Sequence, residues 1–210
     1  MIHYMANKMT SIFVLYGESS DEDRDIYIYA CETLLSTLAN ILLGLLIAFM
    51  VGRLVDGIVF MLGFAVLRRY AGGHHANTHK NCILTFAIVL LCSMVALTII
   101  SRLYIEGILP LAATVAMIGI FILSPVEHEN KPLSADLQVL LKKQSRWISF
   151  TIWILCIIDF YLLSTGIGLP LSLSISAVVG SAVYAVINKR KEGNDYGKTN
   201  IKKESGPSRC

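Results

Sequence analysis

Residues 68–82 read RRYAGGHHANTHKNC and separate two strongly apolar runs, Leu54–Leu67 and Cys82–Ser101. The stretch contains two glycines and three histidines, and its last residue is a cysteine that opens the second run. An apolar run of about 20 residues is long enough to cross a bilayer as a helix. The pattern therefore predicts two membrane helices joined by a short polar connection, with histidine and cysteine side chains at the membrane surface.

Composition extends this reading to the whole chain. Of the 210 residues, 55% are hydrophobic and only 16% are charged, whereas soluble domains carry about 25% charged residues. Mean hydropathy is +0.63. The remaining apolar runs are Cys31–Val51, Gly107–Ser124, Trp147–Gly166 and Leu169–Ile187. We therefore expect an all-α fold, a polytopic transmembrane helical bundle with about six membrane segments.

Leu54–Leu67 is the doubtful segment, because it would give a helix of about 21 Å against a hydrocarbon core of about 30 Å. It either crosses the membrane fully or re-enters on the same side. Lysine and arginine concentrate in residues 68–81, in residues 125–146 and in the C-terminal tail, while the opposite connections hold only Arg53 and Arg102. The positive-inside rule then favours a full crossing and places both termini and both basic loops in the cytoplasm.

These patterns divide the chain into three parts. Residues 1–30 are expected to form a cytoplasmic N-terminal segment, amphipathic in character. Residues 31–187 form the membrane domain. Residues 188–210 are basic and rich in lysine and glycine, so we expect a cytoplasmic tail without regular structure.

The polar stretch has three possible roles. A histidine can take the proton of a cysteine, and the resulting thiolate can attack a carbonyl group. Alternatively, three imidazoles, or two with Cys82, could bind zinc. His75 and His79 are four residues apart, but no acidic residue follows the first histidine as in HExxH sites. A plain interfacial loop is the third possibility.

Asp56 and Asp159 lie in apolar surroundings and are candidates for either a functional or a packing role.

Within this stretch, Arg68, Gly72-Gly73, His75-Ala76 and Cys82 resemble the signature of the accessory gene regulator B family, membrane peptidases that process quorum-sensing propeptides. His75 lies seven residues before Cys82 and seven residues after Arg68. Further along the chain, Ser124-Pro125 and Lys131-Pro132-Leu133 resemble a proline- and lysine-bearing loop of that family.

The resemblance implies a membrane cysteine endopeptidase of the bacterial cell membrane, with its active site at the cytoplasmic interface. Cys82 would be the nucleophile and His75 its base, and the supporting or substrate-binding residues would be Arg68, Gly73, Lys131 and Pro132. The substrate would be a short propeptide with an acidic C-terminal tail. The enzyme would cleave off this tail through a Cys82 thioester and promote cyclisation of the signal segment to a thiolactone or lactone.

The resemblance also sets the expected partners. They are the propeptide, the lipid bilayer and a second copy of the chain in a homodimer. We expect no cofactor, no metal and no nucleic acid. A different class of protein stays open as the alternative: a non-catalytic membrane peptide transporter, or a permease linked to metal or protons.

Overall fold

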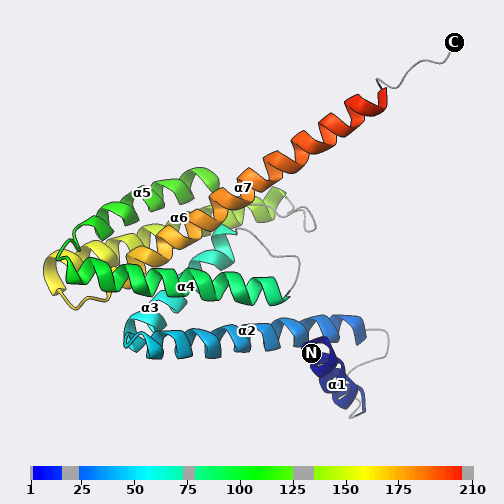
Figure 1. The fold of residues 1–210 in the computed structure, drawn as a ribbon, viewed down its shortest axis with the longest axis horizontal. Helices are drawn as coiled ribbons and strands as arrows, with labels where there is room; N and C mark the ends of the chain where they lie inside the picture. The colour runs from blue at the N-terminus through cyan, green and yellow to red at the C-terminus, as the bar shows by residue number, and fades with distance from the viewer. Residues whose placement is uncertain (1, 16–23, 73–78, 125–134, 205–210) are drawn as a thin grey trace. The chain divides into compact units, whose positions relative to one another are not determined.

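The computed structural model describes residues 2–15, 24–72, 79–124 and 135–204 (Figure 1). The described chain is helical and contains no strand, which confirms the all-α prediction. The helices are α1 (Ile2–Leu15), α2 (Arg24–Met50), α3 (Leu54–Ala71), α4 (His79–Arg102), α5 (Ile108–Leu123), α6 (Ala135–Ile158), the short π-helix η2 (Asp159–Leu163) and α7 (Gly168–Glu204).

Several helices are long and apolar enough to cross a membrane. Four qualify among the described residues: Arg24–Met50, Asn81–Arg102, Asp136–Leu163 and Gly168–Asn188. Helix α5 is also apolar but shorter, with 16 residues. The chain is therefore a helical membrane protein, and the figure of about six membrane segments stays a prediction.

Most helices extend beyond the apolar runs that predict them; α2, for example, begins at Arg24, seven residues before Cys31. Helix α3 continues four residues beyond Leu67, and α6 begins twelve residues before Trp147, within the segment that the sequence placed in a loop. Helix α7 continues through Glu204 and so covers most of the tail for which we expected no regular structure. Hydropathy reports only the apolar part of a helix, whereas lysine, glutamate and arginine are good helix formers that extend it into polar surroundings.

Packing divides the chain into two compact units: residues 1–61 with 76–96, and residues 62–75 with 97–210. In the first unit, α1 packs against α2, and the buried side chains include Ala48, Phe60, Leu90 and Met94. Helices α2 and α3 approach each other closely, because a Cβ atom at Gly57 would overlap the side chain of Ala48. The turn between these helices uses Gly52 at a φ of 75°, a conformation that glycine adopts without strain.

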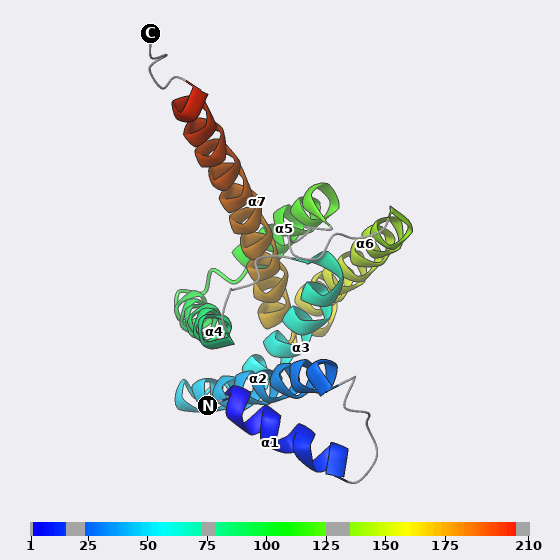
Figure 2. The same ribbon diagram turned by 90° about the vertical axis from the view of Figure 1, so that its right-hand side faces the viewer.

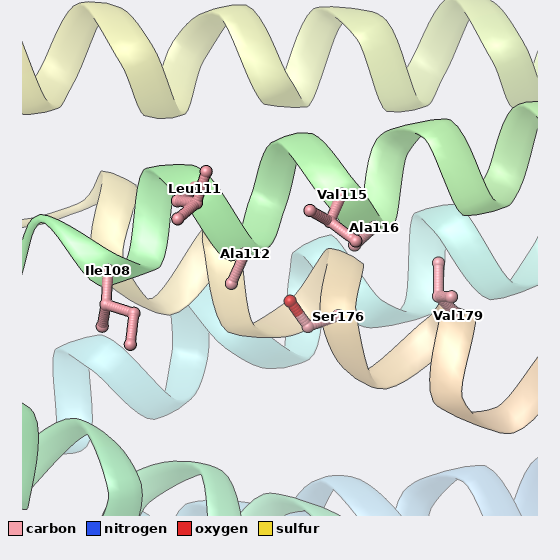
Figure 3. Close-up of a pocket in the computed structure, with 7 residues that line it drawn as sticks. All are labelled: Ile108, Leu111, Ala112, Val115, Ala116, Ser176 and Val179. Atoms are coloured by element: carbon pink, nitrogen blue, oxygen red, sulfur yellow. The ribbon is translucent and has the colours of Figure 1, made fainter.

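In the second unit, α5, α6 and α7 pack against one another. Its buried face consists of small and branched residues, Leu109, Ala113, Ala116 and Ile120. On the α6 side, the indole nitrogen of Trp153 donates to Thr114 Oγ1 at 2.9 Å. On the α7 side, a shallow apolar groove of about 390 Å³ runs along the seam, with Leu111 and Val115 on one helix and Ser176 and Val179 on the other (Figure 3).

Candidate functional site

Helices α3 and α6 bring basic residues to one end of the second unit. Gly63 lies level with Ser174 and Arg68 with Ser181, so the second part of α3 runs parallel to α7. Gly119 of α5 lies level with Val179, and residue numbers rise in the same direction along α5 and α7 (Figure 3), so these two helices also run parallel. Helix α6 runs the opposite way, since its contacts with α5 pair Trp153 with Thr114 and Arg146 with Phe121. The ends of α3 and α5 and the start of α6 therefore share one end of the unit, which we call the basic end.

Arg68 lies at the basic end and is held by α7. Its guanidinium group donates to Ser181 Oγ at 3.1 Å and lies 5.7 Å from the centre of the Phe64 ring. The side chain is half-buried, whereas the neighbouring Arg69 is exposed and lies against the ring of Tyr70. Nothing in the sequence links Arg68 to a serine 113 residues away, so only the fold reveals this partner. These contacts with Ser181 and Phe64 hold the Arg68 side chain in a defined position.

Arg146 closes the carboxyl end of α5. One of its terminal nitrogens donates to the carbonyl oxygen of Phe121 at 2.9 Å, and the guanidinium lies 5.5 Å from that residue's ring. The last carbonyls of a helix lack partners within the helix and carry partial negative charge, which a cation offsets. Beside this contact, the buried hydroxyls of Ser124 and Ser145 are 2.7 Å apart. These bonds fix the point at which the chain leaves α5.

The four remaining site residues predicted from the sequence, Gly73, His75, Lys131 and Pro132, lie outside the described residues. The helices that precede them end at Ala71 and Leu123. Both of these helix ends belong to the basic end.

Cys82 lies in the first turn of α4, a helix that begins at His79. Its thiol is free and its side chain is exposed. Of the other cysteines that the structure describes, Cys156 is buried, Cys31 is half-buried and Cys92 is exposed further along α4. Cys82 therefore differs from Cys92 in position rather than in exposure: it lies at a helix start, where the backbone N–H groups have no partner within the helix.

The two aspartates singled out from the sequence have structural roles. Asp56 pairs with Arg53 at 2.9 Å in the first turn of α3. Asp159 is buried and closes the turn between η2 and α7: it accepts hydrogen bonds from the backbone N–H of Gly168 at 2.8 Å, from the N–H of Thr165 at 3.2 Å and from the Thr165 hydroxyl. Of the two roles left open for Asp159, functional or packing, these bonds favour packing. Among the described residues, no group of three histidine, cysteine, aspartate or glutamate side chains could hold a metal ion.

We expect the Asp159 turn to contribute measurably to stability. Asp159→Ala leaves the buried N–H of Gly168 without its acceptor and should lower the free energy of unfolding by about 1–3 kcal/mol. Gly168→Ala should also destabilise, because its Cβ atom would lie 2.9 Å from the carbonyl oxygen of Cys156. Gly180→Ala is the matched control, since a Cβ atom there meets nothing within 4 Å. The midpoint of thermal unfolding in detergent, followed by circular dichroism, measures all three; equal midpoints would contradict the assignment.

Comparison with known proteins identifies the family. Residues 3–187 match the family profile described as Accessory gene regulator B. Two relatives from Clostridium perfringens type A are similar to the chain. "Putative AgrB-like protein" of strain SM101 is 26% identical over 171 residues, which cover 77% of this chain and 79% of the relative. "Putative AgrB-like protein 2" of strain 13 is 24% identical over 164 residues, which cover 74% and 77%.

No solved structure matches the chain. The family match nevertheless covers all the spanning helices and both segments that carry the candidate residues. The chain belongs to the accessory gene regulator B family, which is associated with the processing of quorum-sensing peptides.

Proposed function

We propose that this protein is a membrane cysteine endopeptidase that removes the C-terminal tail of a short quorum-sensing propeptide and promotes its cyclisation. The observation that carries the proposal is the exposed, free Cys82 thiol in the first turn of α4, seven residues after His75, in a member of this family. Histidine and cysteine together suffice for thiolate nucleophilic catalysis.

In the first half of the reaction, His75 takes the proton of the Cys82 thiol. The sulfur attacks the carbonyl carbon of the peptide bond between signal segment and tail. The tetrahedral oxyanion then collapses, the C–N bond breaks, and His75 protonates the leaving amine. Backbone N–H groups at the start of α4 are suitable donors to the oxyanion, since the first N–H groups of a helix have no partner within it. The products are the free tail and a thioester on Cys82.

In the second half, a thiol or hydroxyl of the signal segment attacks the thioester carbonyl and releases Cys82 as a thiol. Exchange between two thioesters is nearly balanced in free energy, so cyclisation needs no ATP. Forming the first thioester from an amide is uphill, and removal of the tail or the ring draws the sequence forward. Water must be excluded, or the thioester hydrolyses to a linear peptide; a site at the membrane interface serves this purpose.

The basic end suits a substrate with an acidic tail. Arg68 is held half-buried against α7, and Lys142 and Lys143 are exposed on α6. In the proposal, Arg68 and Lys131 contact tail carboxylates, while Gly73 and Pro132 shape the segments next to them. An arginine held in place can bind a carboxylate through two parallel hydrogen bonds.

We further propose six crossings with both termini and the active site in the cytoplasm of a bacterial cell, and a homodimer in the membrane. Helix α3 has 18 residues and is about 27 Å long, close to the hydrocarbon thickness of about 30 Å. The parallel directions of α3, α5 and α7, with α6 opposed, are those that six alternating crossings require. The basic end would then face the cytoplasm, as the positive-inside rule expects.

Cysteine scanning tests this topology. In a variant without the five native cysteines, a cysteine at position 77 or 143 should react with a membrane-impermeant maleimide only after the cells are opened. A cysteine at position 105, in the connection between α4 and α5, should react in intact cells. Labelling of position 77 from outside would contradict six crossings and favour a re-entrant α3.

Alkylation tests the chemistry without any mutation. Iodoacetamide should modify Cys82 faster than Cys92, by about tenfold, because an activated thiol has more thiolate character than a structural one. Release of the tail from a synthetic propeptide with a cysteine-containing signal segment and an acidic C-terminal tail should fall in proportion to Cys82 modification, as measured by mass spectrometry. Complete alkylation of Cys82 with unchanged tail release would overturn the proposed function.

A further inference from the structure

Helix α1 lies against the first half of α2 (Figure 2). Its contacts with α2 show which part of α2 it lies beside. Thr10 Oγ1 lies 3.8 Å from the sulfur of Cys31, the residue that opens the first long apolar run. Arg24, at the start of α2, donates to Asn7 Oδ1 at 3.0 Å and to Ser11 Oγ at 3.5 Å. The middle of α1 is therefore level with the boundary between the polar start of α2 and its membrane-spanning part.

The two faces of α1 differ in character. Ala6 and Thr10 have no exposed surface and form the inner face toward α2. On the outer side, Tyr4, Lys8 and Ile12 are four residues apart and share one stripe, a helical periodicity. Tyr4 is 73% exposed and Ile12 48% exposed, with Met5 beside them at 44%. Large apolar side chains thus surround one lysine on the side of α1 that faces away from α2.

We propose that this outer face of α1, carried by Tyr4, Met5, Lys8 and Ile12, is an interfacial anchor that inserts into the headgroup region of an anionic bilayer. The depth of α1 beside α2 puts the face at that level. The lysine can extend its ammonium group to lipid phosphates while its stem lies among the apolar neighbours. Tyrosine favours the same boundary, where its ring is in apolar surroundings and its hydroxyl in water.

Charge and composition favour lipid over a protein partner. Helix α1 has no acidic residue, and Lys8 lies in the middle of the exposed stripe. A protein docked on this stripe, whether a second copy or the leader of a propeptide, would bury the ammonium group at a cost unless it supplied a carboxylate. A bilayer surface accepts the apolar residues and the cation together, as for other interfacial amphipathic helices. The anchor goes beyond the proposed peptidase function, which requires no residue of α1.

Quenching of a single tryptophan tests the anchor in the full-length protein. Trp147 and Trp153 are replaced with phenylalanine, and one tryptophan is introduced as Tyr4→Trp or Ile12→Trp; both sites are exposed, so the packing against α2 is kept. The matched control is Tyr196→Trp in the basic tail. The proteins are reconstituted in vesicles of phosphatidylcholine and phosphatidylglycerol, with and without acyl chains brominated near the headgroup.

We expect the brominated lipid to lower the emission of residues 4 and 12 by about twofold, and aqueous acrylamide to quench them weakly. Residue 196 should show the reverse pattern. Lys8→Gln should reduce bromine quenching in phosphatidylglycerol vesicles but not in pure phosphatidylcholine. Strong acrylamide quenching without bromine quenching would place α1 in water and overturn the anchor. Protection from both quenchers would mean that protein covers the face, and would overturn it as well. Neither result bears on peptide cleavage.

Discussion

Cys82→Ala is expected to abolish release of the propeptide tail, with a loss on the order of a thousandfold or more, because no other group replaces a covalent nucleophile. His75→Ala should have a comparable effect, since a nucleophile and its base act as a unit. The measurement is mass spectrometry of tail and cyclic product after co-expression with the propeptide. Unchanged protein levels in the membrane fraction would show that both variants are inserted.

Cys92→Ala is the matched control for Cys82→Ala. Both cysteines are free, both are exposed, and both lie on α4, but Cys92 is ten residues further along the helix and away from its start. We expect Cys92→Ala to retain activity. Cys82→Ser is unsuitable as an inactive variant, because a serine can sustain slow turnover. Full cleavage by Cys82→Ala would exclude thioester catalysis at this residue and overturn the proposed mechanism.

The helices were largely predictable from hydropathy, and their ends were not. The run Gly107–Ser124 corresponds within one residue at each end to α5, because α5 is apolar throughout. The run that begins at Trp147 corresponds to a helix that begins at Ala135, since the first turns of α6 are polar and lie outside any apolar window. Packing and helix propensity, rather than hydropathy, determine such ends.

The π-helix η2 had no sequence signal. It ends where Ser164 adopts a φ of 52° and its backbone N–H bonds to the carbonyl oxygen of Asp159 at 2.6 Å. The same aspartate also accepts from Gly168 nine residues later. The sequence marked Asp159 as unusual because an acidic side chain stood in an apolar run. Only the fold shows that the carboxylate oxygens of Asp159 accept hydrogen bonds from the turn that follows η2.

For the candidate site, the sequence supplied the residues and the fold supplied their neighbours. The spacing of Arg68, His75 and Cys82 was visible directly in the chain. The bond from Arg68 to Ser181 and the cap that Arg146 places on α5 join segments far apart in sequence, and no local pattern encodes them. The roles of His75 and Lys131, which lie outside the described residues, stay predictions.

Arg68→Glu is expected to reduce cleavage by on the order of a hundredfold, because it would place a negative charge where we propose that the acidic tail binds. Arg69→Glu is the matched control: it makes the same charge change at the next residue, but its side chain is exposed and lies against Tyr70. If the basic residues only attracted anionic lipid, both substitutions would have similar small effects. The initial rate of tail release distinguishes these cases.

Packing must also be separated from substrate binding at Arg68, because the residue bonds to α7. Ser181→Ala removes the hydroxyl oxygen that accepts from the Arg68 guanidinium at 3.1 Å and leaves the charge of Arg68 in place. We expect it to cost cleavage far less than Arg68→Glu does. A propeptide in which one tail carboxylate is changed to lysine should recover part of the activity of Arg68→Glu and lose activity with the native enzyme. Such a reciprocal exchange requires direct pairing of charges; a failure of every tail lysine to rescue Arg68→Glu, with the enzyme still inserted, would assign Arg68 to the structure of the basic end instead.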